Sequence, residues 1–246
     1  MTDLSVGDGR PRLKELASGI DALYLLGWGE VSPALLDDRA KAKEAARSSS
    51  ESTPLDLGSF VASVSRSGLN RYPYCLPFPE GRLAITDSHK LPPLHVQPSA
   101  EFIHAVGPTA AVEHFTRIAD AFVDGLRWSA TRLDMFSDWQ GWMPEADDRR
   151  RFVGRAVNRV THEVDDELSG FEFGRRKTKT VMARLYDKIR DMQARGSDWW
   201  LDVWGTAHDP AQRVLRVEFE LGRAGLTQYG IDSAAPAIEL APRLWR

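Results

Sequence analysis

Residues Phe171–Lys188 read Phe-Glu-Phe-Gly-Arg-Arg-Lys-Thr-Lys-Thr-Val-Met-Ala-Arg-Leu-Tyr-Asp-Lys. Two segments rich in apolar and aromatic residues flank a short basic segment, which predicts a β-hairpin with a positively charged turn. Side chains on a strand alternate between its two faces. One face of the second strand is therefore predicted to carry Met182, Arg184, Tyr186 and Lys188. A tyrosine between two cations is a candidate nucleophile toward phosphate.

The positive charge of this chain is concentrated around the hairpin. The 246 residues carry a net charge of −3, which argues against nucleic-acid binding by the whole surface. Residues 174–190, in contrast, hold seven basic residues and one acidic residue. Such a run can be an ordinary solvated face. Its position in a turn that leads into the tyrosine strand favours a functional role instead.

Cysteine content and hydropathy limit the class of protein. Cys75 is the only cysteine, so an internal disulfide and a zinc site with several cysteines are both excluded. The sequence shows no apolar run of the length of a signal peptide or a membrane span. We therefore expect a cytoplasmic protein without a membrane partner.

Helical and strand patterns alternate along the chain. Strands are predicted at 20–28, 72–78, 82–86, 94–97, 128–138 and 213–221, and a strand or turn at 199–204. Helices are predicted at 34–47, 111–126, 144–164, 189–195, 224–229 and 234–244. In the 144–164 helix, Val153 and Val157 are expected to point inward. The pattern predicts an α+β fold with a largely antiparallel sheet, helices packed on one face and the active site on the other. We expect an N-terminal portion, 1–95, that binds DNA, and a catalytic portion, 96–246.

Two further strands each combine an apolar face with a charged face. In 130–138 the charged face holds Arg132, Asp134, Phe136 and Asp138, and in 213–221 it holds Arg216, Glu218 and Glu220. Solvent exposure with paired cross-strand charges would explain each strand alone. Together with the tyrosine strand, they contain the components of metal-assisted phosphoryl transfer. Carboxylates such as Asp134 and Glu218 are the ligands that Mg²⁺ or Mn²⁺ prefers. A phenol has a pKa near 10, so Tyr186 would need a metal or a cation to attack as phenolate.

Four motifs in a fixed order resemble the replication initiation factor family, which includes rolling-circle initiators of staphylococcal-type plasmids and relaxases of integrative conjugative elements. The motifs are Thr-Arg-Leu-Asp-Met-Phe-Ser-Asp at 131–138, Phe-Gly-Arg-Arg-Lys-Thr at 173–178, Ala-Arg-Leu-Tyr-Asp-Lys at 183–188 and Leu-Arg-Val-Glu-Phe-Glu-Leu at 215–221. The similarity covers roughly residues 96–245. Arg175 and Thr178 stand where the family usually has serine. The sequence ends within a predicted helix, so we also expect a C-terminus shorter than the family's.

The resemblance implies a metal-dependent endonuclease that nicks and rejoins DNA at a replication origin. Tyr186 would be joined to the 5′-phosphate, and Arg184 and Lys188 would contact phosphate. The implied ligands of Mg²⁺ or Mn²⁺ are Asp134, Glu218, Asp138 and Glu220. The implied DNA contacts are Arg132, Arg175, Arg176, Lys177, Lys179 and Arg216. The implied partners are origin DNA, both duplex and single-stranded, a helicase and a second copy of the chain.

Other interpretations remain open on the sequence alone. The altered turn and the short C-terminus would also suit a non-catalytic DNA-binding or regulatory protein with the initiator fold. A soluble interaction protein with solvated strand faces is a further alternative. His162 and His208 lie near the charged strands and are alternative metal ligands. Trp199 and Trp200 are candidates for stacking on bases or for packing in the core.

Overall fold

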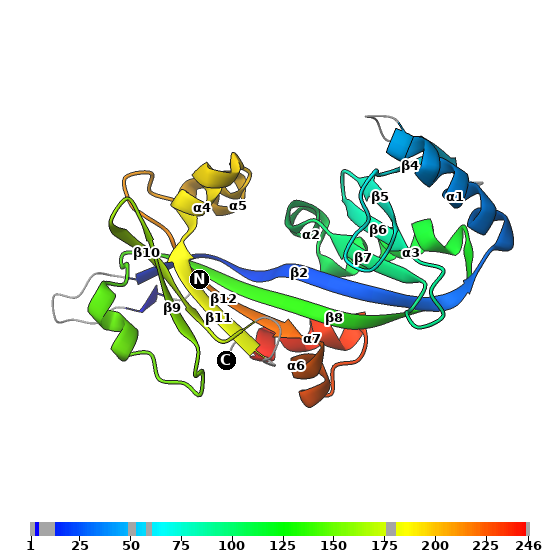
Figure 1. Cartoon of the computed structure of the whole chain (residues 1–246). Helices are drawn as coiled ribbons and strands as arrows, with labels where there is room; N and C mark the ends of the chain where they lie inside the picture. Colours follow the sequence, from blue (N-terminus) through cyan, green and yellow to red (C-terminus); the bar gives the residue numbers. More distant parts are fainter. Residues whose placement is uncertain (1–2, 5–12, 49–52, 58–60, 176–180, 245–246) are drawn as a thin grey trace. The chain divides into compact units, whose positions relative to one another are not determined.

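The computed structural model describes residues 3–4, 13–48, 53–57, 61–175 and 181–244 (Figure 1). The chain forms two compact units that are each discontinuous in sequence. The first unit comprises Met1–Asp21, Asp134–Gln228 and Ala241–Arg246, and the second comprises Ala22–Leu133 and Tyr229–Leu240. The portions expected from the sequence, 1–95 and 96–246, do not coincide with these units. The difference arises because two long strands, β2 (Leu13–Val31) and β8 (Val123–Gln140), each contribute to both.

The first unit contains the tyrosine hairpin as part of an antiparallel sheet. Its strands are β9 (Arg159–Val164), β10 (Glu167–Phe173), β11 (Val181–Asp187) and β12 (Leu215–Gly222), hydrogen-bonded in that order, with β8 beside β12. The hairpin of β10 and β11 pairs Gly170 with Tyr186 and Phe173 with Ala183. Strand β1 (Asp3–Leu4) pairs with the start of β2. The predicted hairpin is therefore confirmed, although most of its basic turn, 176–180, lies outside the described residues.

Helical segments join β11 to β12 in the first unit (Figure 1). Helix α4 (Lys188–Arg195) begins directly after β11, because the Asp187 side chain caps it by accepting hydrogen bonds from two backbone N–H groups, of Ile189 and Arg190. It ends at Gly196, whose φ of 61° is left-handed. Helix α5 (Trp200–Trp204) and a 3₁₀ turn (Gly205–Ala207) follow. They build an aromatic cluster of buried residues: Phe136, Met192, Trp200, Trp204 and Val214.

The second unit has its own sheet and helices. Strands β5 (Tyr74–Phe78), β6 (Gly81–Ile85) and β7 (Leu94–Pro98) precede β2 and β8 in the hydrogen-bonding order. Two helices, α2 (Ala100–Val106) and α3 (Pro108–Asp120), follow β7 in the chain. Helix α1 (Pro33–Ser48) contacts a separate two-stranded sheet of β3 (Thr53–Asp56) and β4 (Val61–Val64). The core is formed by fully buried side chains that face each other across the strands, such as Leu25 and Leu83 on either side of Val96.

The predicted α+β fold with a largely antiparallel sheet is confirmed. Helix α6 (Arg223–Gln228) follows β12, and α7 (Ala234–Leu244) starts in the second unit and ends in the first. A helix also covers part of the sheet face that carries the charged side chains. The centre of the Trp200 ring, from α5, lies 3.8 Å from the guanidinium carbon of Arg216. Within the described residues, none of the helices is both long and apolar enough to cross a membrane.

The predicted helix at 144–164 is wrong. Only a 3₁₀ turn, Ala146–Arg150, and strand β9 lie there, and Val153 and Val157 are exposed instead of inward. The deciding feature is Asp165-Asp166, which both adopt positive φ (54° and 60°) between β9 and β10. Two consecutive residues with positive φ make the tight hairpin turn that matches strand twist. Pairing with β10 thus satisfies the backbone of residues 159–164 as a strand.

Two other boundaries also differ from the sequence prediction. The helix predicted at 111–126 ends at Asp120, and the next apolar residues, from Val123, begin strand β8. The segment 199–204, predicted as a strand or turn, is the short helix α5. In both places a short apolar run suits either a helix or a strand, and packing decides between them.

Candidate active site

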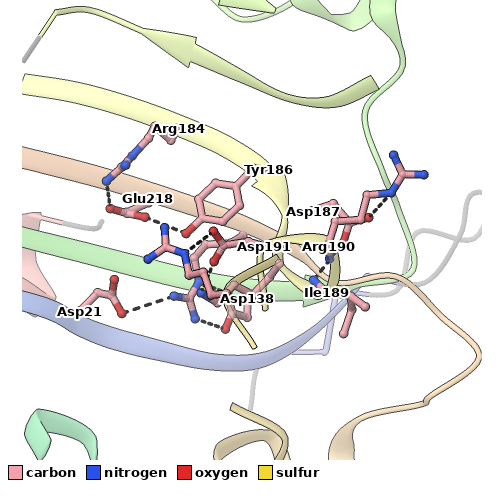
Figure 2. Close-up of polar contacts among 12 residues, drawn as sticks. Asp21, Asp138, Arg184, Tyr186, Asp187, Ile189, Arg190, Asp191 and Glu218 are labelled. Carbon is pink, nitrogen blue, oxygen red and sulfur yellow. Dashed lines mark hydrogen bonds and ion pairs between the residues drawn. The ribbon is translucent and has the colours of Figure 1, made fainter. Parts of the chain in front are cut away.

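The hydroxyl of Tyr186 donates a hydrogen bond to Oε2 of Glu218 at 3.0 Å (Figure 2). Antiparallel pairing of β11 with β12 brings the two side chains together, because Tyr186 lies opposite Arg216 and Arg184 lies opposite Glu218. Both strands turn these side chains to the same face of the sheet. The tyrosine strand and the Glu218 strand are therefore neighbours, with Tyr186 and Glu218 in direct contact.

Arg184 gathers three buried carboxylates. Its Nη2 atom is hydrogen-bonded to Oε1 of Glu218 and lies 3.8 Å from Oδ2 of Asp134 and 3.7 Å from Oε2 of Glu220. All three acidic side chains are nearly excluded from solvent. Burial alone would lower the pKa of Arg184, but Glu218, Tyr186 and the other two carboxylates outweigh it and raise that pKa above its ordinary value. Arg184 thus supplies the positive charge that this cluster requires.

The phenol of Tyr186 is held in its protonated form. Burial is the main cause of a pKa well above the usual value, and the neighbouring Glu218 carboxylate raises the pKa further. Arg216 opposes both effects without cancelling them. At neutral pH the phenol therefore keeps its proton and directs it toward Glu218.

Arg216 is anchored beneath the tyrosine by a buried ion pair. Its Nε and Nη2 atoms contact the two oxygens of Asp138, each at 2.7 Å, and Asp138 also accepts from Nε1 of Trp204 at 2.9 Å. A second carboxylate, Asp21, lies 3.3 Å from Nη1. Arg216 and Asp138 are both fully buried. Asp138 and Arg216 thus form an internal ion pair with each other.

Lys188 is the first residue of α4 and does not continue the strand that carries Tyr186. Its Nζ atom lies 2.8 Å from Asp191 Oδ2, 5.9 Å from the centre of the Tyr186 ring and 5.1 Å from the centre of the Trp200 ring. Burial, followed by repulsion from Arg216, lowers its pKa, while Asp191 acts in the opposite direction. The cation predicted beside the tyrosine is therefore present, held by the helix rather than by the strand.

Two of the remaining residues predicted to bind DNA, Arg132 and Arg175, lie among the described residues. Arg132 belongs to the second unit, where its guanidinium lies 5.0 Å from the centre of the Tyr24 ring. Arg175 is exposed in the first unit and donates from Nε to Asn158 at 3.4 Å. The other three, Arg176, Lys177 and Lys179, lie outside the described residues.

Several residues at the site were not singled out from the sequence. Gly170 faces Tyr186 across the hairpin, and a Cβ atom there would approach the Leu185 carbonyl oxygen to 2.4 Å and Tyr186 Cβ to 2.8 Å. A glycine inside a strand is a signal of such close approach, but Gly170 lies just before the predicted hairpin, Phe171–Lys188. Asp191 lies three residues after Lys188, a spacing at which two side chains on a helix can pair. Asp21 and Trp204 had no local signal, because their partners are distant in sequence.

The chemistry of the carboxylates fits a hard divalent cation, because Asp134, Glu218 and Glu220 offer only oxygen ligands. In the part of the chain that the structure describes, however, no group of three or more His, Cys, Asp and Glu side chains is arranged to hold a metal ion. His162 and His208, the alternative ligands considered from the sequence, are therefore not part of such a group either. In the arrangement seen here, Arg184 provides the counter-charge of the carboxylate cluster.

Comparison with known proteins finds similarity of fold to solved structures. No protein-family model and no curated protein sequence matches this chain. A solved structure of a rolling-circle replication initiator protein from Geobacillus stearothermophilus matches with a TM-score of 0.47 and 16% sequence identity, over 94% of this chain and 80% of that one.

Proposed function

We propose that this protein is a rolling-circle replication initiator or relaxase that nicks one DNA strand, with Tyr186 as the nucleophile. The observation that carries the proposal is the hydrogen bond from the Tyr186 hydroxyl to Glu218, beside the Arg184 guanidinium. A nucleophile hydrogen-bonded to a base, which is itself oriented by a third group, is the arrangement that activates hydroxyl nucleophiles.

In the proposed reaction, Tyr186 Oη attacks the scissile phosphorus while its proton passes to the Glu218 carboxylate. The new bond joins the phenolic oxygen to the 5′-phosphate. The bond to the 3′ oxygen breaks, and that oxygen leaves as a 3′-hydroxyl after taking up a proton. A phenol with a raised pKa requires such a base, because little phenolate exists at neutral pH. In this proposal, Arg184 and Lys188 stabilise negative charge that develops on the phosphate.

Asp134, Glu218 and Glu220 are not arranged as a metal site among the described residues, but we further propose that they become the ligands when a Mg²⁺ or Mn²⁺ ion binds. When bound, such an ion would neutralise charge on the scissile phosphate and polarise it. Asp138 is a weaker candidate ligand, because both of its oxygens already contact Arg216. We also propose origin DNA as the substrate, in duplex and single-stranded form. A helicase and a second copy of this chain are the further partners that the resemblance implies.

The proposal is tested with a supercoiled plasmid that carries the DNA flanking the protein's own coding sequence, in MgCl₂ or MnCl₂. The wild type should convert it to open circles and leave a protein–DNA adduct on a denaturing gel. Tyr186→Phe should form no adduct, because phenylalanine has no hydroxyl to attack the phosphate. Tyr229→Phe is the matched control, since Tyr229 is an exposed tyrosine. An adduct that persists in Tyr186→Phe would disprove the role of this tyrosine.

One observation favours a second candidate function, a non-catalytic DNA-binding protein. The three carboxylates already lie around the Arg184 guanidinium, and the Tyr186 phenol is strongly held in its protonated form. Such a protein would bind its own flanking DNA without cleaving it at any metal concentration. A wild-type protein that shifts this DNA in a gel but yields neither nick nor adduct would decide for the second candidate.

A further inference from the structure

A basic pocket in the second unit is separate in sequence from the tyrosine site. It has a volume of about 510 Å³ and lies among helix α1, the loop between β4 and β5, and the residues after β6. The lining residues that the argument uses are Lys43, Arg47, Arg66, Arg71, Tyr72 and Asp87. All of them belong to the second unit.

Positive charge dominates this pocket. Four of its lining residues are cations and one, Asp87, is a carboxylate. Behind Asp87 lies Arg39, whose side chain is 2% exposed and whose Nη2 atom is 3.7 Å from Oδ2 of Asp87. Its Nε and Nη1 atoms have no hydrogen-bond partner among the described residues. Arg47 also lies 3.8 Å from the exposed Glu44 carboxylate. The four lining cations and the buried Arg39 still outnumber Asp87 and Glu44, which favours binding of an anion.

The pocket is built on a rigid frame rather than on loose side chains. Lys43 Nζ donates to the backbone carbonyls of Ser65 and Arg66 at 2.8 and 2.9 Å, which ties the loop to α1. Leu69 and Tyr72 form a reciprocal backbone bridge that closes the loop. Burial, and secondarily the nearby Arg47, lowers the pKa of Lys43, as expected where cations are crowded together. The exposed guanidinium groups of Arg66 and Arg71 therefore extend from a fixed loop.

The lining has polar side chains, Asn70, Thr86 and Ser88, but it offers no open aromatic surface on which a nucleobase could stack. Tyr72 is its one aromatic residue, and the Tyr72 side chain is 5% exposed, with its hydroxyl donated to the Pro92 carbonyl at 3.0 Å. Base recognition in nucleotide sites relies on open aromatic or apolar surface and on polar groups along the base edge. Arginine side chains without such a surface are typical of contacts to the sugar–phosphate backbone.

We propose that this pocket binds phosphodiester groups of DNA, as a sequence-independent anchor for the strand that the first unit cleaves. The inference rests on the proposed function for its choice of DNA as the source of phosphate. Arg66 and Arg71 contact the phosphates, Arg47 adds charge at the pocket wall, and Lys43 holds the loop in place.

The test compares two double variants of the full chain, each with two cations fewer. Arg66→Gln/Arg71→Gln removes two pocket cations, whereas Lys41→Gln/Arg127→Gln removes two exposed cations of the same unit that do not line the pocket. Affinity for a fluorescent duplex of unrelated sequence is measured by anisotropy from 50 to 300 mM KCl. Each lost phosphate contact reduces the slope of log K against log salt by about 0.9.

The pocket variant should lose about 1.8 from that slope and bind about tenfold more weakly at 100 mM KCl, while the control keeps the wild-type slope. Equal slopes in both variants would overturn the inference. Binding of ATP or pyrophosphate that disappears in the pocket variant, with DNA binding unchanged, would assign the pocket to a free phosphate ligand and also overturn it. Adduct formation at saturating DNA is scored separately, so a protein that never forms the adduct refutes the nicking proposal alone.

Discussion

Arg216 lies directly opposite Tyr186 in the β11–β12 ladder, and its guanidinium is fully buried against Asp138. Tyr186 therefore lies beside a strand position that an internal ion pair holds in place. The centres of the Phe136 and Trp200 rings also lie 4.3 and 3.8 Å from the guanidinium carbon of Arg216. Rigid support of this kind is what a nucleophile needs to keep its geometry.

Removing one partner of the buried pair should destabilise the protein strongly. Asp138→Asn leaves the Arg216 charge uncompensated, and Arg216→Met leaves Asp138 uncompensated, so each should lower the free energy of unfolding by about 3–5 kcal/mol. The double variant should lose clearly less free energy of unfolding than the sum of the losses in the two single variants. Urea unfolding of all four proteins gives the coupling energy.

The matched control is the pair of Arg190 with Glu167, which is far more exposed. Substituting both residues with glutamine should change the free energy of unfolding by less than about 1 kcal/mol. Additive effects in the Asp138–Arg216 cycle would contradict a direct interaction between the two.

Gly170→Ala should displace Tyr186, because the new methyl group would lie 2.8 Å from Tyr186 Cβ and 2.4 Å from a backbone oxygen. We expect at least about a tenfold loss of adduct formation together with about 1–3 kcal/mol of stability. Gly222→Ala is the control in the same sheet, since a Cβ atom there meets nothing within 4 Å. Normal adduct formation by Gly170→Ala would show that the site tolerates a shift of this strand.

Arg184→Ala should make stability depend on divalent metal. Arg184→Ala removes a positive charge from beside the buried carboxylates of Asp134, Glu218 and Glu220, so the melting temperature should fall in EDTA. MnCl₂ at about a hundredfold the dissociation constant should restore about 5 °C or more, because an ion that binds only the folded state stabilises it. Thermal melts with and without MnCl₂ measure this effect.

Arg151→Gln is the control for this metal dependence, since Arg151 is an exposed arginine that pairs with Asp148. The metal assignment fails if MnCl₂ shifts the melting temperatures of Arg184→Ala and Arg151→Gln equally.

His95 should contribute to loss of stability in acid. Burial lowers its pKa from 6.5 to about 4 in the folded protein. Between these two values the unfolded chain takes up a proton that the folded chain does not, so the free energy of unfolding falls as pH falls from 6.5 toward 4. The His95 contribution to this loss between pH 7 and pH 4.5 is roughly 2 kcal/mol.

The measurement is urea unfolding at both pH values. His95→Gln should show a pH dependence smaller by that amount, whereas His89→Gln, at an exposed position, should resemble the wild type. An unchanged pH dependence in His95→Gln would contradict the buried, neutral state of this ring.

Local patterns in the sequence were sufficient to predict the hairpin, the charged faces of the strands and the tyrosine. They were sufficient because period-two alternation and turn composition are properties of neighbouring residues. The same reasoning failed at 144–164, where the residues could be written as an amphipathic helix. There a pair of positive-φ aspartates and pairing with β10 decide for a strand.

By itself, the sequence determined that an arginine, a tyrosine and several carboxylates lie on strand faces, because each strand specifies its own alternation. Only the tertiary structure decided which of them meet. Register across β11 and β12 places Glu218 against Tyr186 and Arg184, while Asp138, from the same predicted face as Asp134, pairs with Arg216 instead. Contacts between residues 30 to 80 positions apart depend on pairing and burial of the whole sheet, which no local pattern contains.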